Sequence, residues 1–474
     1  MKEEKIKKRN IVTKAGIWFT ICNLLQRGIQ FLVTPVYTRL LMPEGYGRYS
    51  TFLTWCNLFG VIATLSLSSG VFNKAMAKYE DSRDDYLTSM IGLSLFSTLV
   101  AVLVYFCVYP FCSNLIGLNV QQSILMFICI YFQMVIQLWS ARRRYEYDYK
   151  PLIITTMCFA FLIPTIGISL YYLVFRSEMG VIIGYTTASL SVGLVLFSVS
   201  IRGISRLYNR DFWKYALAFN MPLIPHYLSN ILMGQSDRLM ISHYCGDYYT
   251  GIYTLAYQIS LVMSIVSNGM ENAITPWTYE NIKSEAYDNI KSRLNPLVVI
   301  STVPFIMIML IAPEFVSVLG SSEYKDAIFV IPPVVASTYI MFINTFLVSI
   351  LFYYEKNVNV MISTSIGAIA NIILNAILLP RVGYIAAAYT TFIGYLLIFD
   401  MNFVSIKRKL WNVGGKIYSI KIFTISIAII CAAIVVSIRI YSLDAIYRWS
   451  AIGIGCLIAF AKKDKIIQLL ENKK

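Results

Sequence analysis

Charged residues are scarce in this chain. Asp, Glu, Lys and Arg make up 14% of its 474 residues, well below the roughly 25% of an ordinary soluble domain, and 57% of the residues are apolar. Apolar runs near the ~20 residues needed to cross a bilayer recur along the whole length, so no segment is left for a soluble domain. These runs do not alternate as barrel strands do, and a backbone in lipid must satisfy its own hydrogen bonds. The sequence therefore predicts an all-α integral membrane protein.

Groups that bind metals or nucleotides, or that carry out catalysis, are equally few. The two His lack metal-ligand spacing, and the nine Cys form no CxxC pair and are interpreted as small apolar fillers. A Gly-x-x-x-x-Gly-Lys-Ser/Thr loop is missing, which excludes ATP as the energy source through this chain. The outer loops are too short to build a catalytic site. We therefore expect no catalytic residue, no metal and no cofactor, and a protein that is not an enzyme.

Fourteen apolar runs are candidate membrane spans. Their approximate limits are 14–37, 46–72, 86–110, 119–141, 150–174, 178–200, 214–243, 249–274, 293–318, 326–352, 358–380, 383–405, 417–438 and 444–461.

The distribution of basic residues orients these spans. With the N-terminus inside, 31 of the 40 Lys and Arg fall on the cytoplasmic side, seven in outer loops and two within spans. Such an asymmetry is typical of cytoplasmic loops. The net charge of +15 is thus explained by topology, and we expect no nucleic-acid binding, because the basic residues are dispersed among short loops. Both termini are predicted to be cytoplasmic.

Two stretches of the chain repeat one pattern. Residues 23–49 and 230–253 each form an apolar helix with an embedded charge, followed by a polar connection that closes on Gly-x-Tyr, and Gly47 and Gly251 are 204 positions apart (251 − 47). The spacing predicts two pseudo-symmetric six-helix lobes and a C-terminal helix pair. The expected domains are residues 1–200, a cytoplasmic connection at 201–214, residues 215–405, and 406–474.

Polar side chains form a stripe on the first and seventh spans. Spacings of three and four place them on one face of each helix. They are Asn23, Gln26, Arg27, Gln30 and Thr34 on the first span, and His226, Ser229, Asn230 and Asp237 on the seventh. Facing lipid, such stripes would be unfavourable, so each is expected to face the other lobe or a water-filled cavity.

Charged residues of the first, seventh and eighth spans are candidates for a functional or a structural role. Arg27 lies near mid-span, where a guanidinium costs about 2.5–3.5 kcal/mol on insertion scales, and either binds a pyrophosphate or pairs with an acid such as Asp237. Asp237 is a candidate for proton or sodium coupling, or a fixed counter-ion. Arg238 points to another helix face and reaches toward outer head groups. Glu271 is a second candidate for ion coupling, or an acid exposed at the membrane interface.

Three motifs then carry a resemblance to a known family. They are Pro35-x-x-Thr38-Arg39-Leu40-Leu41-x-Pro43-x-Gly45-Tyr46-Gly47-x-Tyr49, Asp237-Arg238-x-x-Ile241 followed by Gly251-Ile252-Tyr253, and Asn371-x-x-x-Asn375 with Pro380-x-x-Gly383-x-x-Ala386-Ala387. In order and spacing they resemble the bacterial polysaccharide and O-antigen flippase family, whose superfamily also holds multidrug extruders and lipid II flippases.

The resemblance implies alternating access and a multi-pass protein of the bacterial cytoplasmic membrane that works in surface polysaccharide biosynthesis. Its substrate would be an undecaprenyl-pyrophosphate-linked oligosaccharide, and its partners membrane lipids, a polysaccharide polymerase and other assembly proteins. The predicted cavity residues are Asn23, Gln26, Arg27, Gln30, Asn230, Asp237 and Arg238. Two alternatives stay open: a multidrug antiporter of the same superfamily, and a polytopic polymerase or glycosyltransferase.

Overall fold

The structure, a computed structural model, describes residues 2–202, 206–409, 419–443, 445–450 and 452–453. Every regular element in these ranges is helical, and ten of the described helices are long and apolar enough to cross a membrane. The predicted all-α membrane class is confirmed. The expected span at 444–461 lies mostly outside the described residues. Helices α1 and α8 carry the predicted polar stripes. They are not among the ten, because polar side chains lower their mean hydropathy.

The chain divides into two compact units, Met1–His243 and Tyr244–Lys474. The predicted division at residues 201–214 stays a prediction. The first unit contains α1 (Lys2–Thr64), α2 (Val71–Lys78), η1 (Glu80–Ser82), α3 (Arg83–Ile116), α4 (Val120–Tyr145), α5 (Tyr149–Leu170), η2 (Tyr171–Phe175), α6 (Glu178–Ser200), α7 (Arg210–Asn220), η3 (Met221–Leu223) and all but the last two residues of α8 (Ile224–Cys245).

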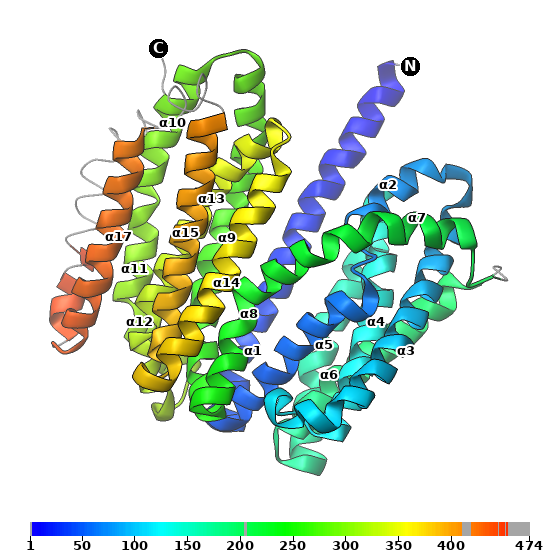
Figure 1. Cartoon of the computed structure of the whole chain (residues 1–474), viewed down its shortest axis with the longest axis horizontal. Helices are drawn as coiled ribbons and strands as arrows, with labels where there is room; N and C mark the ends of the chain where they lie inside the picture. The colour runs from blue at the N-terminus through cyan, green and yellow to red at the C-terminus, as the bar shows by residue number, and fades with distance from the viewer. Residues whose placement is uncertain (1, 203–205, 410–418, 444, 451, 454–474) are drawn as a thin grey trace. The chain divides into compact units, whose positions relative to one another are not determined.

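Helix α4 lies at the centre of the first unit. It packs on α1, α3 and α6, and α5 packs on α1 and α6 (Figure 1). Toward one end of this bundle, the fully buried Phe72, Tyr86 and Met90 join α2 and α3 to α4 and α7 in one hydrophobic core. This core holds the short helices α2 and α7 against the long ones.

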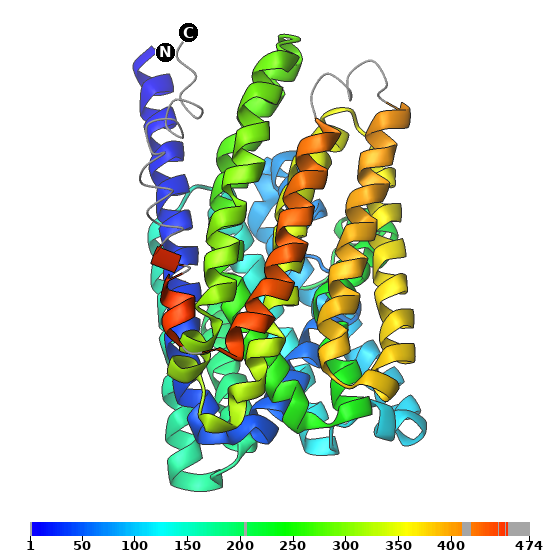
Figure 2. The same cartoon turned by 90° about the vertical axis from the view of Figure 1, so that its left-hand side faces the viewer.

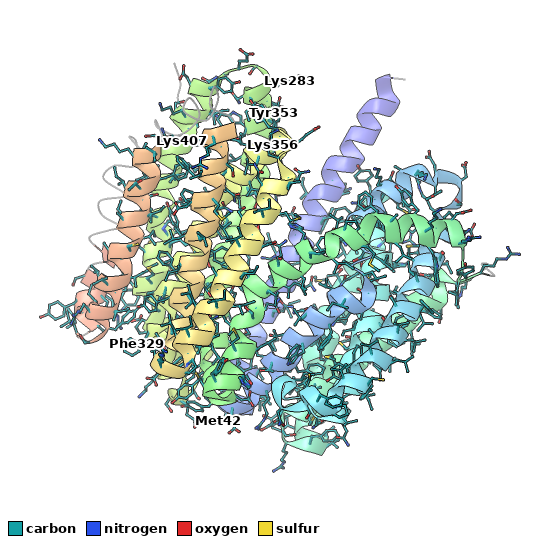
Figure 3. All side chains as sticks on the ribbon, viewed as in Figure 1. Met42, Lys283, Phe329, Tyr353, Lys356 and Lys407 are labelled. Atoms are coloured by element: carbon teal, nitrogen blue, oxygen red, sulfur yellow. The ribbon has the colours of Figure 1, made fainter. Side chains whose placement is uncertain are left out.

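A sharp kink divides α1 into two parts. Met42 has φ 56° and ψ 174°, which no helix allows, and Pro43 after it favours the extended ψ. From this point, labelled in Figure 3, the second part of α1 runs back in the opposite direction (Figure 1). The predicted spans 14–37 and 46–72 are therefore the two arms of α1, and the second arm ends at Thr64.

The second unit is built around α13. It contains α9 (Asp247–Lys283), α10 (Tyr287–Ile300), α11 (Thr302–Leu310), α12 (Ala312–Leu319), η4 (Ser322–Phe329), α13 (Ile331–Tyr353), α14 (Asn357–Val382), α15 (Ile385–Lys409) and α17 (Ile420–Tyr441). Helix α13 packs on α9, α15 and α17, and α14 packs on α15 (Figure 2). Lys283, Lys356 and Lys407 lie at one end of this unit and Phe329 at the other (Figure 3).

Buried side-chain hydrogen bonds connect α13, α14 and α15. Ser363 donates to Asn402 Oδ1 (2.6 Å), and Asn402 donates to Asn344 Oδ1 (2.9 Å). Further along, Asn371 donates to Thr391 Oγ1 (3.1 Å), and Thr390 donates to Asn375 Oδ1. Paired amides of this kind fasten helices where hydrophobic burial is a weak drive to association.

The repeat offset of 204 residues recurs in the backbone. Gly246, at φ 98° and ψ 164°, precedes α9 and follows Met42 by 204 positions (246 − 42), and both residues combine a positive φ with an extended ψ. A second pair, at the slightly larger offset of 208 (355 − 147), is Tyr147 and Glu355, with φ 57° and 56°, each two residues before the helix that follows, α5 and α14. The tyrosines of the two Gly-x-Tyr pairs, Tyr49 and Tyr253, are both buried.

Two predicted spans are interrupted. Span 214–243 is split into α7 and α8 by η3, because Pro222 and Pro225 each remove a backbone donor. Span 293–318 is split into α10, α11 and α12, with Pro313 in the first turn of α12. Apolar composition located these segments, but hydropathy is insensitive to a single broken turn.

Candidate functional site

The first arm of α1 carries the predicted polar stripe on an exposed face. Ala15 and Cys22 are buried, and Trp18 stacks on Tyr149 at the start of α5 (ring centroids 6.3 Å apart). Beside this packed face, Asn23, Arg27 and Gln30 are exposed and Gln26 is half-buried. Thr34 is buried, and its hydroxyl donates to the Gln30 carbonyl (2.9 Å). The stripe is thus open for its first two turns and closes at Thr34.

The stripe on α8 is exposed at its start and buried two turns later. At its start the Asn230 amide lies 3.2 Å from His226 Nε2, and the Ser229 hydroxyl donates to the Pro225 carbonyl (2.8 Å). Asn230 itself is exposed. Two turns on, Asp237 is 1% exposed and Arg238 is half-buried. The open part of α8 therefore offers amide and imidazole groups, while its carboxylate is enclosed.

Close contacts anchor the base of α8 to the end of α1. Leu65 and Ser66, both at positive φ, turn their carbonyls toward Asn220. The fully buried Asn220 amide donates to both carbonyls, at 3.1 and 3.3 Å. Nearby, Gly70 lies at φ 56°, which favours glycine, and a Cβ there would lie 2.8 Å from the Tyr227 hydroxyl. The broken turn before α8 is thereby held against the turn that follows α1.

Sequence reasoning missed two polar bridges in this unit. Asn57, on the second arm of α1, donates to Gln235 Oε1 of α8 (2.9 Å). Ser68, past the end of α1, donates to Gln137 Oε1 of α4 (3.0 Å). Asn57 and Gln137 are exposed, as are Asn23, Arg27 and Gln30 of the stripe on α1. The partners are 178 and 69 positions apart, so no local pattern in the sequence could indicate either pair.

Arg27 and Asn57 lie at equal distances along the sequence from the kink at Met42. Each lies 15 residues from Met42 (42 − 27 and 57 − 42), on arms that run in opposite directions (Figure 1). At a rise of 1.5 Å per residue, both are about 22 Å from the kink. The guanidinium on the first arm and the amide bridge on the second are thus at comparable depth within the unit.

The segment 35–49, which carries the first of the three motifs, makes packing contacts and hydrogen bonds around the kink. Tyr37 and Tyr49 meet edge to face (5.7 Å), Tyr171 donates to the Leu40 carbonyl (2.7 Å), and Arg48 pairs with Glu178 (2.9 Å). These contacts hold the kinked turn of α1 against η2 and α6. The motif therefore sets where the two arms diverge.

Outside the two stripes, Glu271 is half-buried on α9, in the second unit. Among the described residues no group of three or more His, Cys, Asp or Glu could hold a metal ion. The assignment of Glu271 and Asp237 to ion coupling, and of the stripe residues to substrate binding, stays a prediction.

Comparisons of sequence place the chain among proteins of glycan synthesis. The profile of the family described as "Polysaccharide biosynthesis protein" matches residues 12–282. The "Lsg locus putative protein 1" of Haemophilus influenzae is 26% identical over 73% of this chain and 86% of its own length. The "Probable low-salt glycan biosynthesis flippase Agl15" of Haloferax volcanii is 20% identical over 85% of this chain and 86% of its own.

Comparison of structures shows a shared transporter fold. The "Lipid II flippase MurJ, inward closed conformation" superposes with a TM-score of 0.68 at 16% identity, covering 95% of this chain and all of that one. A multidrug resistance MATE family transporter of the MOP superfamily, in its inward-facing conformation, gives a TM-score of 0.61 at 15% identity, covering 84% of this chain and 96% of that one. The family profile matches more than half of the sequence, and the fold agrees with it. The chain therefore belongs to the polysaccharide biosynthesis protein family.

Proposed function

We propose that this protein is a flippase that moves an undecaprenyl-pyrophosphate-linked oligosaccharide from the cytoplasmic to the outer leaflet by alternating access. The observation that carries the proposal is the exposed polar face of α1, on which Arg27 is the one charged residue between Lys14 and Arg39. The family, and a relative named as a glycan biosynthesis flippase, support the substrate class.

The side chains on this face suit the head group of such a lipid. A planar guanidinium donates forked hydrogen bonds to phosphate oxygens, and Arg27 is exposed on this face. The amides of Asn23, Gln30 and Asn230 both donate and accept, as sugar hydroxyls require. We infer that these groups replace water around the pyrophosphate and glycan while the polyprenyl tail stays in lipid.

The side chains on these exposed faces also disfavour a multidrug antiporter. A cationic drug calls for accessible carboxylates and aromatic faces. The open parts of the two stripes carry amides, one imidazole and one guanidinium, and the one carboxylate in the stripes, Asp237, is buried. Charge at the exposed face thus matches an anionic substrate.

The family and the distribution of basic residues support a setting for the proposed activity. We propose that the protein lies in the bacterial cytoplasmic membrane with both termini cytoplasmic, as the excess of cytoplasmic Lys and Arg favours. Its partners there are membrane lipids, and downstream a polysaccharide polymerase and other assembly proteins that use the exported unit.

The test is complementation in a strain that lacks the native copy. Deletion should make a lipid-linked oligosaccharide accumulate on the cytoplasmic side, and Arg27→Ala should fail to relieve it. The control is Lys14→Ala, which removes another exposed cation from the same helix, outside the stripe and the motifs, and should leave export unchanged. Increased drug sensitivity without accumulation would support the antiporter instead, and full export by Arg27→Ala at normal expression would refute the proposed site.

A further inference from the structure

A surface cavity of about 600 Å³ lies in the first unit, at the connection between α6 and α7. Its lining includes Ser82 and Asp85 at the start of α3, and Arg206, Tyr208, Asn209 and Arg210 before and at the start of α7. A volume of this size is typical of a site for a small molecule or a head group. None of these residues belongs to the polar stripes of α1 and α8.

The charges in this lining are of both signs. Arg206, Arg210 and Asp85 take part in no ion pair among the described residues, whereas the nearby Asp84 pairs with Arg142 and Glu80 with Arg83. The general excess of basic residues in cytoplasmic loops is enough to explain why Arg206 and Arg210 are present. It does not account for a carboxylate that shares their cavity and is not neutralised by them. The lining thus offers two cationic groups and one anionic group to a ligand.

An apolar stripe on α3 leads away from this cavity. Asp85, Gly92, Phe96, Leu99 and Leu103 are spaced by seven, four, three and four residues, which places them on one face of the helix. Phe96, Leu99 and Leu103 are 57%, 55% and 69% exposed. The charged cavity and the lipid-facing stripe therefore follow one another along a single helix face.

The connection before α7 crosses α3 between these two regions. At Gly92 a Cβ would overlap the backbone of Leu207, so glycine is what lets the connection lie directly on the helix. Beyond the crossing, the Trp213 ring contacts both Tyr208 (4.8 Å) and Phe96 (5.7 Å), and its indole donates to the Ser89 carbonyl (3.1 Å). Aromatic side chains anchored in this way are typical of the boundary between head groups and hydrocarbon.

We propose that this cavity binds the head group of a membrane phospholipid that carries both a phosphate and a primary ammonium, namely phosphatidylethanolamine. The phosphate lies between Arg206 and Arg210, the ammonium donates to Asp85, and the acyl chains follow Phe96, Leu99 and Leu103. This head group uses all three charges of the lining. A purely anionic head group would place its charge next to Asp85 and leave that carboxylate without a cation.

The site lies on the segment that joins α6 to α7. A lipid held there would hold the connection to α3 at the membrane surface. This inference does not depend on the proposed flippase activity, because it concerns a lipid bound at the rim of the first unit and a different set of residues.

Native mass spectrometry of the purified, delipidated full chain tests the proposal. Phosphatidylethanolamine, phosphatidylglycerol and phosphatidylcholine with identical acyl chains are titrated separately. Phosphatidylethanolamine should bind most tightly, and Arg206→Ala and Arg210→Ala should each weaken it about tenfold, as expected for a lost charge-assisted hydrogen bond. Arg202→Ala, an exposed arginine of the same connection outside the lining, should leave binding unchanged.

Whether Asp85→Asn weakens or strengthens lipid binding decides between the two kinds of head group. The proposal requires weaker binding of phosphatidylethanolamine, because its ammonium loses an anionic partner. Tighter binding of phosphatidylglycerol, with no loss for phosphatidylethanolamine, would overturn the proposal in favour of an anionic lipid. Equal binding of all three lipids, or an Arg202→Ala effect as large as that of Arg206→Ala, would show general attraction only and would also overturn it. Unchanged size-exclusion profiles of the variants confirm that each is folded.

Discussion

Replacing the buried Asn220 tests whether its side-chain amide holds the start of α8 against the turn that follows α1. Asn220→Ala removes the hydrogen bonds to the carbonyls of Leu65 (3.1 Å) and Ser66 (3.3 Å) and supplies no replacement donor. The Leu65 carbonyl is buried and the Ser66 carbonyl partly so. Leaving a buried acceptor unpaired costs about 1–3 kcal/mol, and losing the less buried bond about 0.5–1.5 kcal/mol. We expect Asn220→Ala to lower the free energy of unfolding by about 1.5–4.5 kcal/mol, the sum of these two contributions.

Unfolding of the purified protein by increasing mole fractions of SDS measures this difference. Asn73→Ala serves as the control, because Asn73 is exposed on the neighbouring helix α2 and should be neutral. Asn220→Asp is nearly isosteric but turns an acceptor toward two carbonyls, so it should be at least as unstable as the alanine variant. Equal unfolding midpoints for Asn220→Ala, Asn73→Ala and the unmodified protein would refute the role of Asn220 as the anchor of α8.

Three further predictions follow from single contacts. Gly184→Leu should prevent folding or lower stability by at least about 2 kcal/mol, because even a Cβ there would overlap the backbone of Gly167 on α5; thermal unfolding checks this. Met42→Gly should raise stability by about 1 kcal/mol, since glycine adopts φ 56° without strain, and an unchanged or lowered unfolding midpoint would contradict it. Asn57→Ala and Gln235→Ala, singly and together, should give a coupling energy of about 0.5–1.5 kcal/mol in a double-mutant cycle, and strictly additive effects would show that the bridge is not formed.

The membrane class and the polar face of α1 could be predicted because both are local patterns. Hydropathy over some twenty residues locates a span, and spacings of three and four locate a face. The exposure of Asn23, Arg27 and Gln30 beside the packed face of Cys22 agrees with the stripe inferred from spacing alone. Whether these residues bind substrate stays a prediction, because exposure shows access and not occupancy.

The remaining features depend on tertiary contacts. The break before α8 requires Asn220 to meet two carbonyls 154 and 155 positions away, and the bridge from Asn57 to Gln235 spans 178 positions. In one sequence, an asparagine that closes such a contact looks the same as one that faces water. Pro222 and Pro225 did signal a broken turn, but the apolar residues on either side outweighed them in a hydropathy average.

The repeat separates the features that the fold requires from the polar groups that we propose to serve transport. At the offset of 204, the backbone break is kept, as Met42 and Gly246 share a positive φ and an extended ψ although their side chains differ. The polar groups are not kept: Arg27 corresponds to Ile231, and Asp237 to Val33. A symmetric scaffold therefore carries asymmetric chemistry. Because an exposed guanidinium occurs on only one of the two corresponding helices, a substrate that binds it has one preferred side, and Arg27 is the residue whose loss should separate transport from folding.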